Sequence, residues 1–253
     1  MTAIFKREFL SYFRSPVGYV AIALFSFLSG FIFYSQFAAG TVDIAGEVIT
    51  LRSFFVIIVP IITMGLLSED KKRGTDILYY TTPVNLFNVV IGKVLAAFAL
   101  YAIMFINVII HIIVTVNCGG VFGVGAVGTI IVFFFMAFMY IAIGLFASAI
   151  TDSQIISAIV AFIIILVTQL LGTFGDYLGA AFTSILSGIN SNFAQKAGNA
   201  ISKAINWLDP FLKTQDFRLG IFSVSSLVFL VSVGILFLYL TFRVLDKKRW
   251  SQN

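Results

Sequence analysis

The side chains best suited to a function lie together between Ser68 and Pro83. A run of acidic and basic residues opens this segment, Gly74 breaks the chain, and Thr75 can cap a short apolar and aromatic helix. Apolar side chains rimmed by charge are typical of a docking site, although a helix that only lies on the membrane is the alternative. We therefore expect residues 69–85 to bind another protein. The residues expected to contact it are Glu69, Arg73, Gly74, Thr75, Asp76, Leu78, Tyr79, Tyr80 and Pro83.

A second set of polar residues lies inside long apolar stretches. Asn107 and His111 are four residues apart, so they share one face of a helix, and Thr168 and Gln169 interrupt a later stretch. A lone histidine makes no metal site, and no acidic residue lies near His111 in the sequence. The four residues are expected either to line a polar path or to hydrogen-bond between helices.

Motifs for nucleotide chemistry are missing from the sequence. Lys93 follows a glycine but precedes Val94, where a phosphate-binding loop needs serine or threonine. The glycines of 123–128 match G-x-G-x-x-G, but they follow a hairpin instead of a strand, so close helix packing explains them better. No nucleophile has a partner base. The chain is therefore expected to be no enzyme and to bind no cofactor or metal itself.

The composition indicates a membrane protein. Of the 253 residues, 60% are hydrophobic and 11% are charged, with a mean hydropathy of +1.06. Because a membrane span needs about 20 apolar residues, the gaps between charges serve to locate the spans. No charge is expected in the middle of a span, which argues against an ion relay. The six predicted spans are 17–37, 51–68, 92–116, 126–149, 153–173 and 220–243.

The distribution of basic residues predicts the orientation. An even number of spans puts both termini on one side of the membrane. Eleven of the 16 Lys and Arg residues then lie on the side of the termini, which predicts that both termini are cytoplasmic. The net charge of +5 is explained in this way, without a nucleic acid partner.

Two segments outside the spans are expected to be amphipathic helices. Residues 2–14 place aromatic side chains on one stripe and basic ones opposite, which predicts a helix in the membrane interface. Residues 174–219 predict an extracytoplasmic helical segment that is broken near Gly188 or Gly198 and stops at Pro210. It is expected to cap the outer mouth or to lie along the outer interface.

The sequence resembles the ABC-2 type permeases. The run from Glu69 to Thr75, the Pro83-Val84 step and the Gly-Lys at Lys93 are similar to that family's signature between the second and third spans. The similarity extends over the whole chain and is greatest to the gliding-motility-type branch. One position departs from the pattern, since family members often carry Glu where Ile77 stands here.

The resemblance implies an all-α integral membrane fold of six transmembrane helices, like type V exporters, in a single domain 1–253. It also implies an elbow helix at 2–14, a coupling helix at 74–82 and external helices before the last span. Two permeases, identical or paralogous, would form the substrate pathway in the bacterial cytoplasmic membrane as an exporter. Separate ABC ATPase subunits would hold ATP and Mg, and an auxiliary membrane protein with an external domain can accompany them. The alternatives are an ATPase-coupled scaffold that does mechanical work, and a passive channel or carrier.

Overall fold

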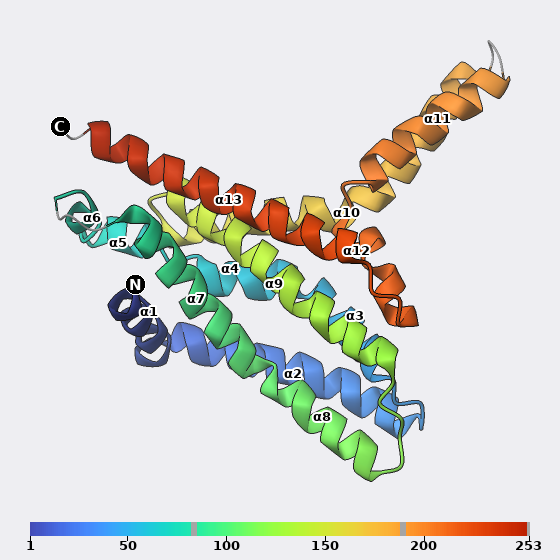
Figure 1. Cartoon of the computed structure of the whole chain (residues 1–253), viewed down its shortest axis with the longest axis horizontal. Coiled ribbons are helices and arrows are strands. Elements are labelled where there is room, and N and C mark those ends of the chain that lie inside the picture. Colours follow the sequence, from blue (N-terminus) through green and yellow to red (C-terminus); the bar gives the residue numbers. More distant parts are fainter. Residues whose placement is uncertain (82–84, 188–190, 252–253) are drawn as a thin grey trace.

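The computed structural model describes residues 1–81, 85–187 and 191–251, without the side chains of 80, 81 and 249–251. The described elements are all helical, which confirms the predicted fold class (Figure 1). In chain order they are α1 (Thr2–Arg14), α2 (Pro16–Ala38), α3 (Ile44–Ser53), α4 (Phe55–Thr63), α5 (Ser68–Lys72), α6 (Ile77–Thr81), α7 (Leu86–Met104), α8 (Ile106–Asn117), α9 (Val124–Ile150), α10 (Gln154–Leu186), α11 (Ser191–Asn206), α12 (Pro210–Lys213), the 3-10 helix η1 (Gln215–Leu219) and α13 (Val224–Ser251).

Five helical segments in the described chain are long and apolar enough to cross a membrane, and a bent pair can make a sixth span. Four of the five are α2, α9, α10 and α13, and the fifth consists of α7 followed by α8. The bent pair consists of α3 and the segment Phe55–Lys72, at an angle of 59°. The chain is therefore a multi-pass membrane protein, and the predicted number of six spans holds if the bent pair is one span.

The bent span differs from the predicted span 51–68, because its first helix begins seven residues earlier, at residue 44. It carries Glu47 and Arg52 into the bundle, where they are 0% and 4% exposed. The prediction that no charge lies inside a span is therefore wrong. Both side chains have partners that the sequence does not reveal, since Glu47 contacts His111 and Arg52 donates to Thr214. Hydrogen-bonded charges can lie where an isolated charge would be costly.

The helix α9 forms the centre of the bundle. It contacts α3, α4, α7, α10 and α13, and 67% of the residues in its most apolar stretch are buried. The rings of Phe133 and Tyr140 on α9 lie 5.0 and 5.6 Å from the ring of Phe55 on α4. These aromatic contacts position the bent second span against the central helix.

Two of the three glycines in 123–128 serve close packing, as predicted, whereas Gly123 has nothing within 4 Å of an added Cβ. Cβ atoms added at Gly125 and Gly128 would lie 2.2 and 2.5 Å from the carbonyl oxygens of Arg218 and Phe217. Only glycine leaves room for the backbone of η1 at this distance. The 3-10 helix that precedes the last span is therefore packed directly on α9.

The helix α1 matches the predicted boundaries 2–14 and lies against α7 at the end of the bundle that carries both termini, the termini end (Figure 1). The rings of Phe5, Phe9 and Phe13 follow one another at centroid distances of 5.7 and 5.3 Å. Tyr12 is buried, and its hydroxyl donates to the carbonyl of Ile62 at 2.8 Å. The helix is therefore bound to the bundle by one face as well as being amphipathic.

The helix α10 is longer than a membrane is thick. Its 33 residues extend over about 50 Å, whereas the apolar core of a bilayer measures about 30 Å. The second half of α10 packs against α11, and together they form the arm, residues 176–187 and 191–206 (Figure 1). In this hairpin Asp176 accepts hydrogen bonds from Ser202 and Asn206 at 2.9 and 3.0 Å.

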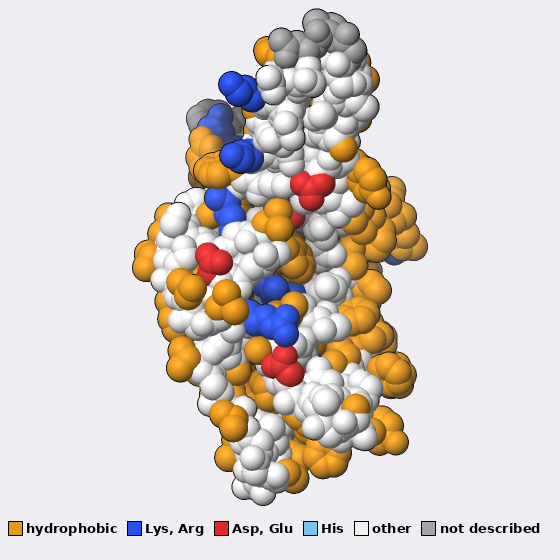
Figure 2. Space-filling view, turned by 90° about the vertical axis from the view of Figure 1, so that its right-hand side faces the viewer, with side chains coloured by type: hydrophobic (Ala, Val, Ile, Leu, Met, Phe, Trp, Pro, Cys, Tyr) orange, Lys and Arg blue, Asp and Glu red, His pale blue; other side chains and the backbone are white. Residues whose placement is uncertain are grey.

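Of the two predicted breaks in the external segment, the one near Gly188 agrees with the structure, since α10 ends at Leu186 and α11 begins at Ser191; Gly188 itself lies outside the described residues. Gly198 does not break a helix but lies inside α11, where its backbone meets that of Gly179. The helix α11 ends at Asn206, three residues before the predicted stop at Asp209-Pro210, and Asp209 then caps the short α12 by accepting from the Phe211 amide at 2.6 Å. The arm projects away from the rest of the bundle (Figures 1 and 2), and the two positions predicted for it, at the outer mouth or along the outer interface, stay predictions.

A methyl group at Gly198 should separate the two helices of the arm. The Cβ of Gly198→Ala would lie 2.4 Å from the Gly179 carbonyl oxygen, so we expect a loss of about 1–3 kcal/mol in local stability. Faster proteolysis of the arm in the purified chain would show it. Gly30→Ala is the control, because nothing lies within 4 Å of its added Cβ. Equal proteolysis of both variants and the wild type would contradict the packing.

Candidate functional site

Lys93 lies at the centre of a group of charges at the termini end of the bundle. Its side chain, on α7, is 0% exposed. The Nζ atom lies 2.6 Å from Oδ2 of Asp70 and 3.0 Å from Oε1 of Glu8, and it also donates to the carbonyl of Leu66. A buried ammonium group needs such opposite charges and acceptors. Lys93 therefore joins α7 to α1 and to α5.

Tyr79 adds α6 to this group. Its hydroxyl donates to Oδ2 of Asp70 at 2.5 Å and accepts from Nη2 of Arg7 at 2.9 Å. Burial raises the pKa of Tyr79 despite the nearby charge of Lys93, so the phenol keeps its proton as a donor. Burial opposes the charge of Arg7, but its hydrogen bonds to Glu8 and Tyr79 outweigh burial and raise its pKa. These five residues, Arg7, Glu8, Asp70, Tyr79 and Lys93, are called the Lys93 cluster below.

The chain turns between α5 and α6 at Gly74. Its φ of +68° lies in the left-handed region that favours glycine. The Thr75 hydroxyl donates back to Oδ1 of Asp70 at 3.0 Å, so its bond is to the preceding helix and not to the helix it was predicted to cap. Beyond the turn, Ile77 and Leu78 on α6 are 51% and 56% exposed. The loop therefore presents apolar side chains while its polar groups bind inward.

The helix α5 is also bound to the junction of α9 and α10. The Ser148 hydroxyl accepts from two backbone N–H groups at the start of α5, both at 2.9 Å. The Lys71 ammonium donates to carbonyls at the end of α9, including that of Thr151 at 2.8 Å, and pairs with Asp152 at 3.4 Å. A lysine at the carboxyl end of a helix is favoured by the helix dipole. The loop therefore contacts both halves of the bundle.

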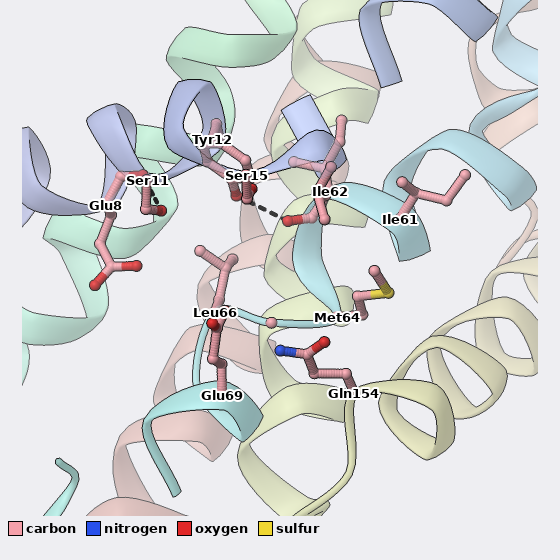
Figure 3. Close-up of a pocket in the computed structure, with 12 residues that line it drawn as sticks. Glu8, Ser11, Tyr12, Ser15, Ile61, Ile62, Met64, Leu66, Glu69 and Gln154 are labelled. Carbon is pink, nitrogen blue, oxygen red and sulfur yellow. Dashed lines mark hydrogen bonds between the residues drawn. The ribbon is translucent and has the colours of Figure 1, made fainter. Parts of the chain in front are cut away.

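A charged cleft lies between α1 and this loop. A small cavity beside the Tyr12–Ile62 hydrogen bond has Glu8 and Glu69 on its wall (Figure 3). It adjoins a cleft of about 330 Å³ that is also lined by Arg7, Arg14 and Arg73. Charged walls of this kind accommodate water, so the polar face of α1 does not lie against lipid alone.

The predicted docking residues are placed close together, with one correction. Tyr79 is only 6% exposed, so the prediction that it faces outward is wrong, because Arg7 and Asp70 bind its hydroxyl. The Tyr80 side chain and the whole of Pro83 lie outside the described part. Their docking role stays a prediction, as it does for the residues that the structure places on the loop: Glu69, Arg73, Gly74, Thr75, Asp76 and Leu78.

Asn107 and His111 both bind neighbouring helices. Asn107 Nδ2 donates to the Ser26 hydroxyl at 2.8 Å, and His111 Nδ1 lies 2.7 Å from Oε1 of Glu47. No acidic residue lies near His111 in the sequence, and the acidic partner that the structure gives it comes from a helix 64 residues earlier.

Thr168 and Gln169 lie apart from this pair, on α10. The Thr168 hydroxyl donates within its helix to Ile165 and lies 3.4 Å from the Tyr140 hydroxyl. Gln169 borders a cleft beside Asp209, and its buried Nε2 has no partner among the described residues. The structure does not bring the four polar residues together into one path.

The sequence argument missed how the Lys93 cluster is assembled. The resemblance includes Lys93 only as part of a family signature, and the sequence pattern shows Asp70 only as one of a run of charges. One signal was present: Lys93 follows sixteen residues without an acidic or basic side chain and precedes a long apolar stretch. A lysine in that position needs an acidic partner from another segment.

These features define a multi-pass helical membrane protein whose loop between its second and third spans is bound into the bundle by buried charges. The family model of the ABC-2 family transporter proteins matches residues 2–250, so the chain belongs to that family. Membership makes it the membrane subunit of an ABC transporter, a generally non-catalytic subunit that pairs with ABC ATPase subunits. No curated protein matches the chain. The gliding-motility-type branch stays a prediction.

Removing the lysine should destabilise the protein strongly. Lys93→Met leaves the carboxylates of Glu8 and Asp70 together with only the half-exposed Arg7 to pair with them, so we expect a loss of about 3–5 kcal/mol. The thermal unfolding midpoint of the purified chain in detergent measures this. Arg73→Ala is the control, since its pair with Glu69 is exposed and should contribute less than about 1 kcal/mol. A similar small effect of both variants would show that the cluster does not hold the loop.

Proposed function

We propose that the chain is the permease subunit of an ATP-driven exporter and that its 69–85 loop receives the motion of the ATPase. Two permease copies, identical or paralogous, would enclose the substrate pathway. The termini end would face the cytoplasm in a bacterial cytoplasmic membrane, as the excess of basic residues there favours. ATP and Mg would bind to the partner ATPase subunits.

One observation supports this proposal above the others: α6 presents Ile77 and Leu78 while the Lys93 cluster holds its other side. A coupling element has to contact a partner and also pass displacement to the membrane helices. Exposed apolar side chains suit the first task. The hydrogen bonds of Tyr79 and Asp70 to α1 and α7 suit the second.

The bonds of the loop suggest where a displacement would go. Pushing α6 would shift α1 and α7 through the Lys93 cluster. It would also shift the junction of α9 and α10 through Ser148 and Lys71. Packed helices respond to such a push by moving as units. The loop would therefore act on the helices at both sides of the bent second span.

A second candidate function is favoured by the arm. Because α10 runs from the junction beside Lys71 to the arm without interruption, displacement of the junction would also move the arm. An ATPase-coupled scaffold that performs mechanical work on an external or auxiliary protein would use such an arrangement. A passive channel or carrier would need no loop of this kind.

A charge placed on the exposed face of α6 should disrupt ATPase binding without unfolding the chain. Leu78→Asp is expected to lower the amount of ABC ATPase that co-purifies with the tagged chain by at least about tenfold. Mass spectrometry of the co-purified proteins and the ATPase rate of the complex measure the effect. The control is Leu219→Asp, which is 76% exposed at the end of η1.

The two variants separate the alternatives. Loss of the ATPase with Leu78→Asp alone supports the docking role of α6. Normal ATPase content and normal transport with Leu78→Asp would contradict that role. Solute movement by the purified chain without any ATPase would instead favour the channel or carrier.

A further inference from the structure

The chain buries a carboxylate beside its single histidine in the half of the bundle away from the termini. Glu47 of α3 is 0% exposed, and its Oε1 accepts from the Ser29 hydroxyl of α2 at 2.9 Å. The same oxygen lies 2.7 Å from Nδ1 of His111 on α8. The imidazole is stacked on the ring of Phe33, at 4.2 Å and an interplanar angle of 6°. Three helices therefore meet at one carboxylate.

Hydrogen bonding leaves this carboxylate incompletely satisfied. Its second oxygen, Oε2, is buried and has no partner among the described residues. The Ser29 hydroxyl donates to Glu47 at 2.9 Å and also lies 3.4 Å from Nδ1 of His111, so the three side chains form one hydrogen-bonded group. A neutral imidazole that donates from Nδ1 would leave the site with one uncompensated negative charge. In a membrane protein such a buried charge costs several kcal/mol.

Among the described side chains, no other charge compensates Glu47. The other charges at α3, Asp43 and Arg52, are directed elsewhere, since Asp43 pairs with Arg218 and Arg52 donates to Thr214. The helices α2, α4, α8 and α9 carry no Asp, Glu, Lys or Arg. The remaining titratable groups on the neighbouring helices do not contact Glu47. Lys93 of α7 lies in its own cluster, and the Tyr140 hydroxyl of α9 lies at Thr168. The Tyr101 hydroxyl of α7 has no partner among the described residues, and Tyr19 and Tyr34 of α2 are exposed.

We propose that Glu47 and His111 form a proton-binding site that links the packing of α3 against α8 to the acidity on that side of the membrane. One added proton, at Nε2 of the imidazole or at Oε2 of the carboxylate, makes the pair neutral. The path of a proton from water to the pair is short, since the His111 side chain is 13% exposed and lies six residues, about 9 Å, before the end of α8. On the orientation proposed above, that side is the exterior.

The direction of this linkage follows from the burial of the pair. When α3 and α8 are packed together, the pair lies away from water and the neutral, protonated form is favoured. When the helices part, water solvates the carboxylate and the added proton is released. Acidity at this face therefore favours the packed arrangement, because the state that binds the proton more tightly gains from it.

The test compares pH dependences in the full-length chain purified in detergent. The apparent unfolding equilibrium is measured at about pH 8 and at about pH 5.5 for wild type, Glu47→Gln, His111→Gln and the double variant. Acid should favour folding of wild type by up to about tenfold per pH unit relative to the double variant, the limit for one bound proton. His111→Gln should be the least stable at the higher pH and recover in acid. Glu47→Gln should lose the acid stabilisation altogether, because its buried neutral imidazole takes up a proton only on unfolding. Ser26→Ala, which removes only the neighbouring Asn107 bond, should keep the wild-type slope.

Two results would overturn the proposal. One is the same pH dependence for wild type as for Glu47→Gln and the double variant; this comparison stands even if His111→Gln does not fold. The other comes from a fluorophore on Cys118, the single cysteine, which is exposed just beyond α8. Acid should reduce its quenching by a water-soluble quencher in wild type but not in Glu47→Gln, and no difference between them would contradict the link to helix packing. Neither result depends on ATPase docking at α6.

Discussion

The structure depends on one ammonium group held between two carboxylates. Lys93 sits inside the bundle because Glu8 and Asp70 come to it from α1 and α5, and Tyr79 adds α6 through Asp70. Desolvation makes each charge costly alone and makes removal of any one partner costly as well. An interfacial helix, a turn of charged residues and a membrane span thereby become one mechanical unit. The exposed apolar face of α6 is part of that unit.

The bent second span extends the same principle to the opposite half of the bundle. Its bend between Ser53 and Phe55 lets α3 enter the bundle beside α8 and α9. Glu47 then meets His111, and Arg52 reaches Thr214 near the base of the arm. At its other end the span passes into α5, which Ser148 and Lys71 bind to α9 and α10. Buried charges therefore connect the two ends of the bundle to its central helices.

The elements that depend only on neighbouring residues could be predicted from the sequence. The helix 2–14, the span near 17–37 and the turn at Gly74 follow from amphipathic spacing, apolar length and a missing side chain. The start of the second span could not be predicted, because Glu47 lies in the bundle only when a histidine 64 residues later meets it. Tyr79 was predicted to face outward for the same reason, since Arg7 is distant in sequence.

We expect α1 and the 69–85 loop to move together when the partner ATPase binds and hydrolyses ATP. Spin labels on cysteines at the exposed positions Lys6 and Lys72, in a Cys118→Ser background, test this directly in the assembled complex. The distance between the labels is measured with the ATPase nucleotide-free and with it trapped in its ATP-bound state. An unchanged distance is predicted, because Glu8, Asp70 and Lys93 hold the two elements together. A change of several ångström between the two states would contradict the account.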